Sequence, residues 1–200
     1  DLDWTTLPGV LAEALRKAGR LGAVLSPFLT VEEAYLLVRL VRGIDPQALL
    51  ATGPVPVAGT DEHFPGGFTI AAEKCPNRRG VEAVVAHFAS GKVLSLEQLL
   101  DALPSSGVRG LWVSGGAPSG SQGFDEAAAR AVESLDLLVV QDLFPSALSD
   151  RADYVLPAAA FAERDGSYVN RADRLQSARW AVRPPAGVRP EGSLFWEMLD

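Results

Sequence analysis

The stretch GVRGLWVSGGAPSGSQGFDEAAARAVESLDLLVVQD, residues 107–142, decides the fold class. Its first apolar segment runs to Ser114 and leads into a glycine-rich turn. The segment 124–135 then has the apolar spacing of an amphipathic helix, with acidic residues in its first turn. A second apolar segment follows at 136–142. A strand, a helix and a strand in this order predict a β–α–β unit with parallel strands and a right-handed crossover.

A second unit of the same kind precedes this one. The short apolar run GAVLSP (22–27) ends at a proline, as expected of a buried strand. A helix pattern from Thr30 to Arg42 follows, in which Thr30 and Glu33 have the spacing of a capping box, and residues 49–52 form another candidate strand. Alternating strands and helices predict an α/β fold, an open and mainly parallel sheet with helices on both faces, of the Rossmann-like type.

The remaining sequence predicts shorter elements around this sheet. Residues 53–79 are rich in proline and glycine and have no sustained periodicity, which predicts a long irregular excursion. Both ends of the sequence look cut from a longer polypeptide, so we expect residues 1–200 to be a single α/β domain of a larger chain. The other expected elements are helices over 8–18, 80–90 and 95–103, a strand over 153–157, a hairpin or extended tail within 166–183, and a packed apolar run at 194–199.

Composition excludes several functional classes. The net charge of −7 argues against nucleic-acid binding, which requires a basic surface. A single cysteine excludes a disulfide framework, and it excludes an iron–sulfur or zinc site held by this chain alone. The single cysteine also fits a reducing, cytoplasmic compartment. No apolar run is long enough to span a membrane, so we expect no direct membrane insertion.

Polar and glycine residues follow the two strands of the 107–142 unit. Gly115 and Gly116 follow the first strand, where a phosphate can approach the backbone at the start of a helix. Their spacing fits neither the dinucleotide fingerprint nor the Walker motif, so a flexible turn is the alternative. Gln141 and Asp142 end the next strand at the same edge of the sheet. Asp142 either accepts hydrogen bonds from a base or ribose, or caps the turn that follows it.

Further polar residues gather near the C-terminus and around the cysteine. Asn170, Arg171, Arg174 and Gln176 place several donors in one extended segment, which either binds a phosphate or purine edge or forms ion pairs with an acidic neighbour. Basic residues near Cys75 could lower the pKa of its thiol. Because it has neither a resolving cysteine nor a partner base, we interpret Cys75 as incidental.

Several stretches resemble the molybdopterin oxidoreductase family. Segment 136–176 is similar to the family's run D-x-V-V-x-Q-D, A-D-V-V-L-P and E-x-x-G-T-x-x-N-x-E-G-R-x-Q, and segments 25–43 and 111–118 are similar to two others. KCPNRRGVEAV (74–84) resembles a P-N-x-x-G-V-E signature of the G subunit of bacterial NADH:quinone oxidoreductase. Val31 and Ala117 stand where the family usually has asparagine.

The resemblance implies a set of cofactor contacts. In cofactor-bearing members the matching positions help to hold the guanosine and pyrophosphate of molybdopterin guanine dinucleotide. An apolar side chain in place of an amide removes hydrogen bonds, each worth about 1 kcal/mol, so Val31 and Ala117 indicate a vestigial site. The positions that match the family contacts are Gly115, Gly116, Pro118, Gln141 and Asp142, with Asn170 and Arg174 less closely matched.

These patterns favour a structural, cofactor-free domain of the G subunit of NADH:quinone oxidoreductase, respiratory complex I. It would have no catalytic residues and no metal ligands. Its partners would be other subunits of the complex and an N-terminal region carrying the iron–sulfur clusters, on the cytoplasmic side and peripheral to the inner membrane. The alternative is a fragment of a formate dehydrogenase-like enzyme that binds molybdopterin guanine dinucleotide. A third possibility is an unrelated Rossmann-like nucleotide-binding protein.

Overall fold

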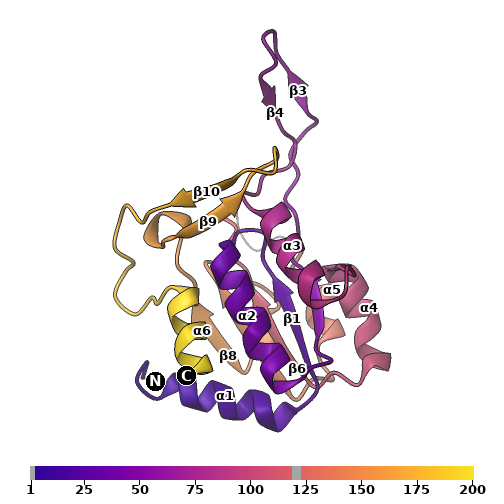
Figure 1. Ribbon diagram of the computed structural model, residues 1–200. Helices are drawn as coiled ribbons and strands as arrows, with labels where there is room; N and C mark the ends of the chain where they lie inside the picture. Colours follow the sequence, from indigo (N-terminus) through magenta and orange to yellow (C-terminus); the bar gives the residue numbers. More distant parts are fainter. Residues whose placement is uncertain (1–2, 119–122) are drawn as a thin grey trace.

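The centre of the molecule is a parallel sheet of six strands (Figure 1). The computed structural model describes residues 3–118 and 123–200. All neighbouring strands of this sheet pair in parallel, in the order β5-β2-β1-β6-β7-β8. The strands are β1 (Leu21–Leu25), β2 (Leu49–Thr52), β5 (Leu94–Ser95), β6 (Gly110–Ser114), β7 (Leu137–Asp142) and β8 (Tyr154–Pro157).

This strand order is that of a doubly wound sheet. The chain builds outward from β1 to one edge through β2 and β5, and then returns to build the other edge through β6, β7 and β8. The direction of building therefore reverses between β1 and β6, and ligands of open α/β sheets bind beyond the strand ends at such a point. The predicted α/β fold class is confirmed.

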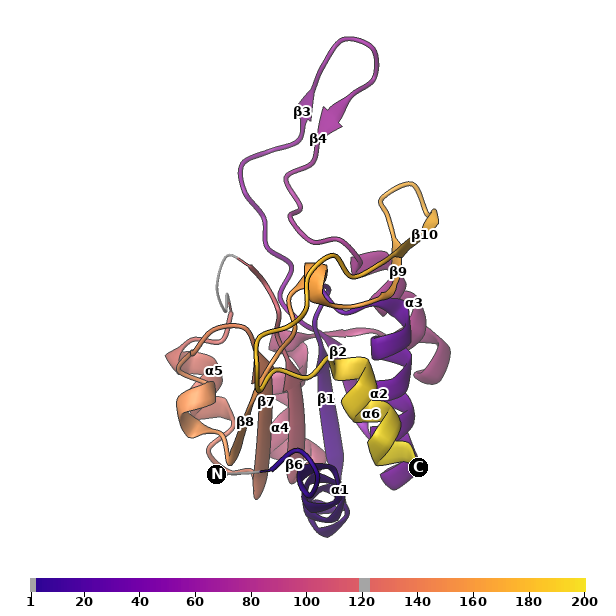
Figure 2. The same cartoon turned by 90° about the vertical axis from the view of Figure 1, so that its left-hand side faces the viewer.

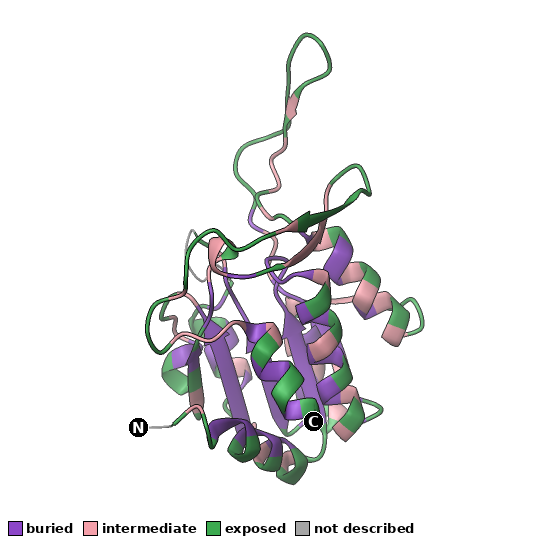
Figure 3. Cartoon of the chain, turned by 60° about the vertical axis from the view of Figure 1, so that its left-hand side comes forward, coloured by how far each residue is buried: buried purple, intermediate pink, exposed green. Residues whose placement is uncertain are grey.

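Helices cover both faces of the sheet (Figure 2). One face packs against α1 (Leu7–Ala18), α2 (Val31–Ile44), α3 (Arg78–Phe88) and α6 (Glu191–Leu199), and the other against α4 (Leu96–Ser106) and α5 (Glu126–Ala131). Because successive strand residues point to opposite faces, the two faces form separate apolar cores, one containing Val139 and the other Val140. Figure 3 shows the sheet as the buried layer between them.

Local sequence signals explain where the helices begin. Thr30 and Glu33 form the expected capping box, since Thr30 Oγ1 accepts from the Glu33 N–H and Glu33 Oε2 accepts from the Thr30 N–H. The pair at 95 and 98 caps α4 in the same way. Helix α5 is shorter than the predicted 124–135, because a tight turn after Ala131 directs the chain into β7.

Two regions outside the sheet form small hairpins. The excursion 53–79 was predicted to be irregular, but within it β3 (Glu62–His63) and β4 (Thr69–Ile70) pair as a hairpin that projects from the body (Figures 1 and 2). Within 166–183, β9 (Gly166–Val169) and β10 (Leu175–Ala178) form the second hairpin. None of the helices in the described parts of the chain is long and apolar enough to cross a membrane.

Candidate functional site

The candidate site is the crevice where β1 and β6 end. Here the Ser114 hydroxyl joins the two strands, because Oγ accepts from the Ser26 N–H at 2.9 Å and donates to the Val24 carbonyl at 2.9 Å. The glycine turn follows Ser114 directly, and Asp142 ends the neighbouring strand. The structure thus brings the predicted residues Gly115, Gly116 and Asp142 to one point.

The Asp142 carboxylate is bonded to the turn beside it. Its Oδ1 accepts from the Gly116 N–H and from the Leu143 N–H, each at 2.7 Å. A Cβ atom on Gly115 would lie 2.1 Å from Asp142 Cγ, so only glycine allows this approach. Gly116 has φ +104°, a conformation that also favours glycine. In this arrangement Asp142 ties the glycine turn to the backbone that follows β7, and its two predicted roles stay predictions.

The space left at the crevice is small. The described residues enclose a cavity of about 20 Å³, enough for about one water molecule. Ligand pockets usually measure about 300–1,000 Å³. This cavity by itself is too small for a molybdopterin guanine dinucleotide, and a separate cavity of about 970 Å³ lies beside it, where Gly53 and Pro54 follow β2. The small cavity is lined by Ser26, Phe28, Pro54, Pro56, Ser114, Gly115, Ala117, Phe124 and Asp142.

Gln141 lies on the opposite face of the sheet from Asp142. It follows Val140 in β7, so its side chain shares the face of Val139 and cannot point into the same space as the Asp142 carboxylate. Gln141 is fully buried, and neither its Nε2 nor its Oε1 has a hydrogen-bond partner within residues 3–118 and 123–200. A buried polar group without a partner costs about 1–3 kcal/mol.

The other predicted residues lie away from this crevice or at its margin. Asn170 sits in the β9–β10 turn, where its Oδ1 accepts from the N–H groups of Ala172 at 2.9 Å and Arg174 at 3.1 Å. Asn170 lines a different cavity, of about 740 Å³, and Arg174 is exposed. Pro118 is exposed. The following part of the predicted glycine-rich turn, 119–122, lies outside the described residues.

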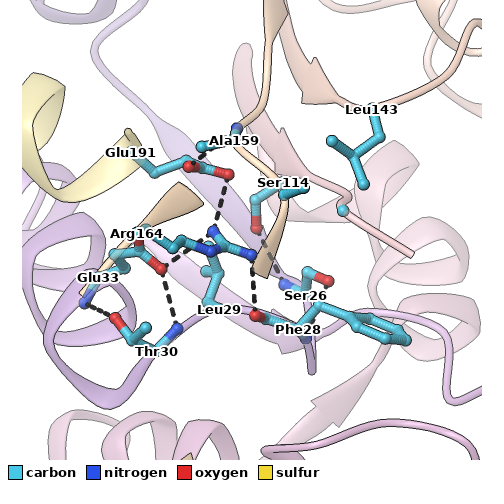
Figure 4. A network of polar contacts seen from close by, with 12 residues as sticks. Ser26, Phe28, Leu29, Thr30, Glu33, Ser114, Leu143, Ala159, Arg164 and Glu191 are labelled. Atoms are coloured by element: carbon cyan, nitrogen blue, oxygen red, sulfur yellow. Dashed lines mark hydrogen bonds and ion pairs between the residues drawn. The ribbon is translucent and has the colours of Figure 1, made fainter. Parts of the chain in front are cut away.

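A buried cation that the sequence did not single out lies beside the glycine turn. The guanidinium of Arg164, which is 3% exposed, lies 3.1 Å from Glu33 Oε2 and 3.0 Å from Glu191 Oε1 (Figure 4). Its Nη2 also donates to the Phe28 carbonyl at 3.1 Å. A Cβ atom on Gly116 would lie 3.7 Å from the same Nη2, so the cation borders the crevice. We call Arg164, Glu33 and Glu191 the buried triad.

Burial sets the electrostatics of the buried triad. Burial raises the pKa of Glu191 to about 7, although the nearby Arg164 charge acts to lower it, and Glu33 raises it further. Burial alone would lower the pKa of Arg164, but Glu191 and Glu33 raise it above its ordinary value. The cation beside the glycine turn is therefore paired with carboxylates of its own chain.

The surroundings of Cys75 raise the pKa of its thiol. Burial and the neighbouring Glu73 carboxylate raise the pKa of Cys75 to about 12, and its Sγ lies 3.4 Å from Glu73 Oε1. Arg78 acts to lower this pKa, as the sequence suggests, but burial and the Glu73 carboxylate outweigh it, so the net shift is upward. The interpretation of Cys75 as incidental remains a prediction.

The fold and the glycine turn define a doubly wound α/β domain whose strand-end crevice lies at the reversal of strand order. A comparison with family models identifies the family. The model described as molybdopterin oxidoreductase matches residues 11–199, so the chain belongs to the molybdopterin oxidoreductase family.

Curated relatives carry several different names. The alpha chain of an F420-dependent formate dehydrogenase of Methanocaldococcus jannaschii is 38% identical over 92 residues, which are 46% of this chain and 14% of that protein. The alpha chain of an NADPH-Fe(3+) oxidoreductase of Geobacter sulfurreducens is 30% identical over 112 residues, which are 56% of this chain and 13% of that protein. A G chain of an NADH-quinone oxidoreductase of Rhizobium meliloti is 32% identical over 100 residues, which are 50% of this chain and 12% of that protein. The chain corresponds to a small part of each relative.

Proposed function

We propose that residues 1–200 form a single structural, cofactor-free domain of a G-type subunit of NADH:quinone oxidoreductase. In this role the domain packs against the cluster-bearing region of its own subunit and against neighbouring subunits on the cytoplasmic side of the membrane. The assembled complex transfers electrons from NADH to quinone, while this domain supplies no reacting group. The observation that carries the proposal is the crevice of about 20 Å³ at the strand ends.

Two features in and near the crevice support this function over cofactor binding. The Arg164 guanidinium, which a cofactor phosphate would attract, is already paired with two buried carboxylates. The positions where the family has asparagine are also apolar. Val31 packs against α3, because a Cβ atom built on Gly80 of that helix would lie 2.9 Å from Val31 Cγ2. Ala117 lines the crevice, but its methyl side chain has no amide group with which to bond a cofactor.

A relative also supports the complex I assignment. The G chain of the NADH-quinone oxidoreductase of Rhizobium meliloti matches half of this chain at 32% identity. The P-N-x-x-G-V-E resemblance at 74–84 lies at the start of α3, where Asn77 donates to the Leu29 carbonyl at 2.7 Å and accepts from the Val169 N–H at 2.6 Å. This asparagine joins three segments of the domain, which is a structural role.

The second candidate is a domain of a formate dehydrogenase-like enzyme that binds molybdopterin guanine dinucleotide. The 38% identity with the alpha chain of a formate dehydrogenase favours it. In that enzyme the glycine turn would hold the pyrophosphate and the polar strand ends the guanosine, and the cofactor would supply the redox chemistry. The crevice would first have to widen.

The substitution Asp142→Asn separates the two candidates. In the structural domain, NADH:quinone activity per assembled complex should stay within about twofold of the wild type, because no reacting group is removed. In a cofactor-binding domain, the same substitution should remove bound cofactor and activity while assembly stays normal. The measurement is activity normalised to assembled complex, with subunit content determined on the same sample. A large loss of activity in fully assembled complex would refute the structural role.

A further inference from the structure

We propose that the projecting hairpin at residues 57–73, here called the arm, inserts its aromatic tip into an apolar groove with a basic rim on a different protein chain. This inference goes beyond the proposed function, because that function assigns no contact surface to the domain. It rests on the chain's being part of a larger assembly, and it does not depend on whether the crevice binds a cofactor.

The arm is held together by its own hydrogen bonds. The Ala58 N–H donates to the Ala72 carbonyl at 2.9 Å, and the Phe64 N–H donates to the Phe68 carbonyl at 2.8 Å. Two glycines with positive φ, Gly66 and Gly67, form the turn at the tip. These hydrogen bonds set the shape that the arm presents to a partner.

The tip exposes aromatic rings to solvent. Phe64 and Phe68 contact each other with ring centroids 5.8 Å apart, and Phe68 is 64% exposed. Ile70 and Val57 extend the exposed apolar surface towards the body. Figures 1 and 2 show the arm standing clear of the sheet and its helices, and Figure 3 shows it mostly exposed. Aromatic side chains presented in this way are typical anchors of protein interfaces.

A hairpin of this size is marginally stable alone. Two-stranded hairpins generally need a third strand or a packed face for independent stability, and β3 and β4, which pair with each other, are only two residues long each. The free edges of β3 and β4 also offer unpaired backbone groups, which usually require cover or a partner strand. Binding of the tip would supply the missing packing.

Charge indicates the kind of partner. The arm contains Asp61, Glu62 and Glu73 and has no lysine or arginine. The whole chain carries a net charge of −7, so a second copy would repel the acidic arm. A groove flanked by lysine and arginine would attract the two acidic residues just before the tip, while its apolar floor received the phenyl rings.

The test is photocrosslinking in the assembled complex. The full-length parent is made in its native host with p-benzoylphenylalanine in place of Phe68, the complex is purified, and crosslinked peptides are identified by mass spectrometry. A crosslink to another polypeptide, at an apolar segment flanked by lysine or arginine, is expected. Crosslinks only within the parent chain, crosslinks to a second copy of it, or no crosslink in a fully assembled complex would each overturn the proposal.

A second measurement tests the charges and the rings separately. Phe64→Ser with Phe68→Ser should lower incorporation of the parent into the complex at least about tenfold. Asp61→Lys with Glu62→Lys should lower it too, with the loss smaller at high salt. The matched control is Glu97→Lys with Asp101→Lys on α4, which should leave incorporation unchanged. Equal incorporation of arm and control variants would contradict the proposal, whereas molybdenum in the complex would contradict only the cofactor-free function.

Discussion

Replacing Glu191 by glutamine should remove a pH dependence of stability that the buried triad creates. Glu191 is buried, and its pKa of about 7 in the folded chain exceeds its ordinary value of 4.5. A group whose pKa is raised by folding stabilises the fold at pH values below its unfolded pKa. That contribution is lost as the pH rises through the folded pKa, because the carboxyl must ionise in a buried site.

The size of the effect follows from these two values. One pKa unit corresponds to about 1.4 kcal/mol, so ionisation of Glu191 should cost the wild type about 2–3 kcal/mol of unfolding free energy between pH 5 and pH 8. Glutamine keeps an acceptor for Arg164 but cannot ionise, and Glu33 remains to neutralise the guanidinium. The variant should therefore lose less stability than the wild type over the same pH range.

Urea unfolding at pH 5, 6, 7 and 8 measures this difference directly. The comparison between the two proteins removes the contribution of all other titrating groups, because they are common to both. The curves of unfolding free energy against pH should diverge as the pH rises from 5 towards 8, with the variant becoming the more stable relative to the wild type. Parallel curves, or a wild type whose relative stability rises with pH, would refute this prediction.

Three other substitutions or measurements test neighbouring parts of the account. Arg164→Met should lower the unfolding free energy, measured by urea titration, by about 3–5 kcal/mol, because it leaves two buried carboxylates uncompensated. The control is Arg179→Met at an exposed position, which should change the same quantity by less than about 0.5 kcal/mol. Gly115→Ala should lower the unfolding free energy by about 1–3 kcal/mol, because its new Cβ atom would collide with the Asp142 carboxylate. An unchanged urea midpoint of unfolding would contradict the close approach of Gly115 to Asp142. Cys75 should react with a thiol reagent at pH 8 far more slowly than free cysteine, since its pKa is raised to about 12; a rate equal to that of free cysteine would show that the thiol is not shielded.

The sheet could be predicted because its signals are local. Apolar runs at 22–25, 110–113 and 137–140 lie between turn residues, and the capping box at Thr30 fixes the start of α2. Periodicity could not predict the hairpin of the arm, because its two strands are each two residues long. Its hydrogen bonds depend on the turn at Gly66 and Gly67.

The candidate site could be predicted only in part. The glycine turn and Asp142 meet because both follow strands that are adjacent in the sheet. Gln141 and Asp142 both match the family's cofactor contacts, but the alternation of side chains along β7 sends them to opposite faces. The buried triad had no local signal, because Arg164 is 131 residues from Glu33 in the sequence. Arg164 lies just before β9, which packs against α2, and Glu191 belongs to α6, which packs against α2 as well.

The molybdenum content of the purified full-length parent tests the central proposal most directly. The protein should be made in a host that synthesises molybdopterin, and a formate dehydrogenase made in the same host serves as the positive control. Elemental analysis should find molybdenum well below one atom per chain, with no guanine dinucleotide released on denaturation. About one molybdenum atom and one dinucleotide per chain would show that the crevice opens to hold the cofactor, and would contradict the cofactor-free role.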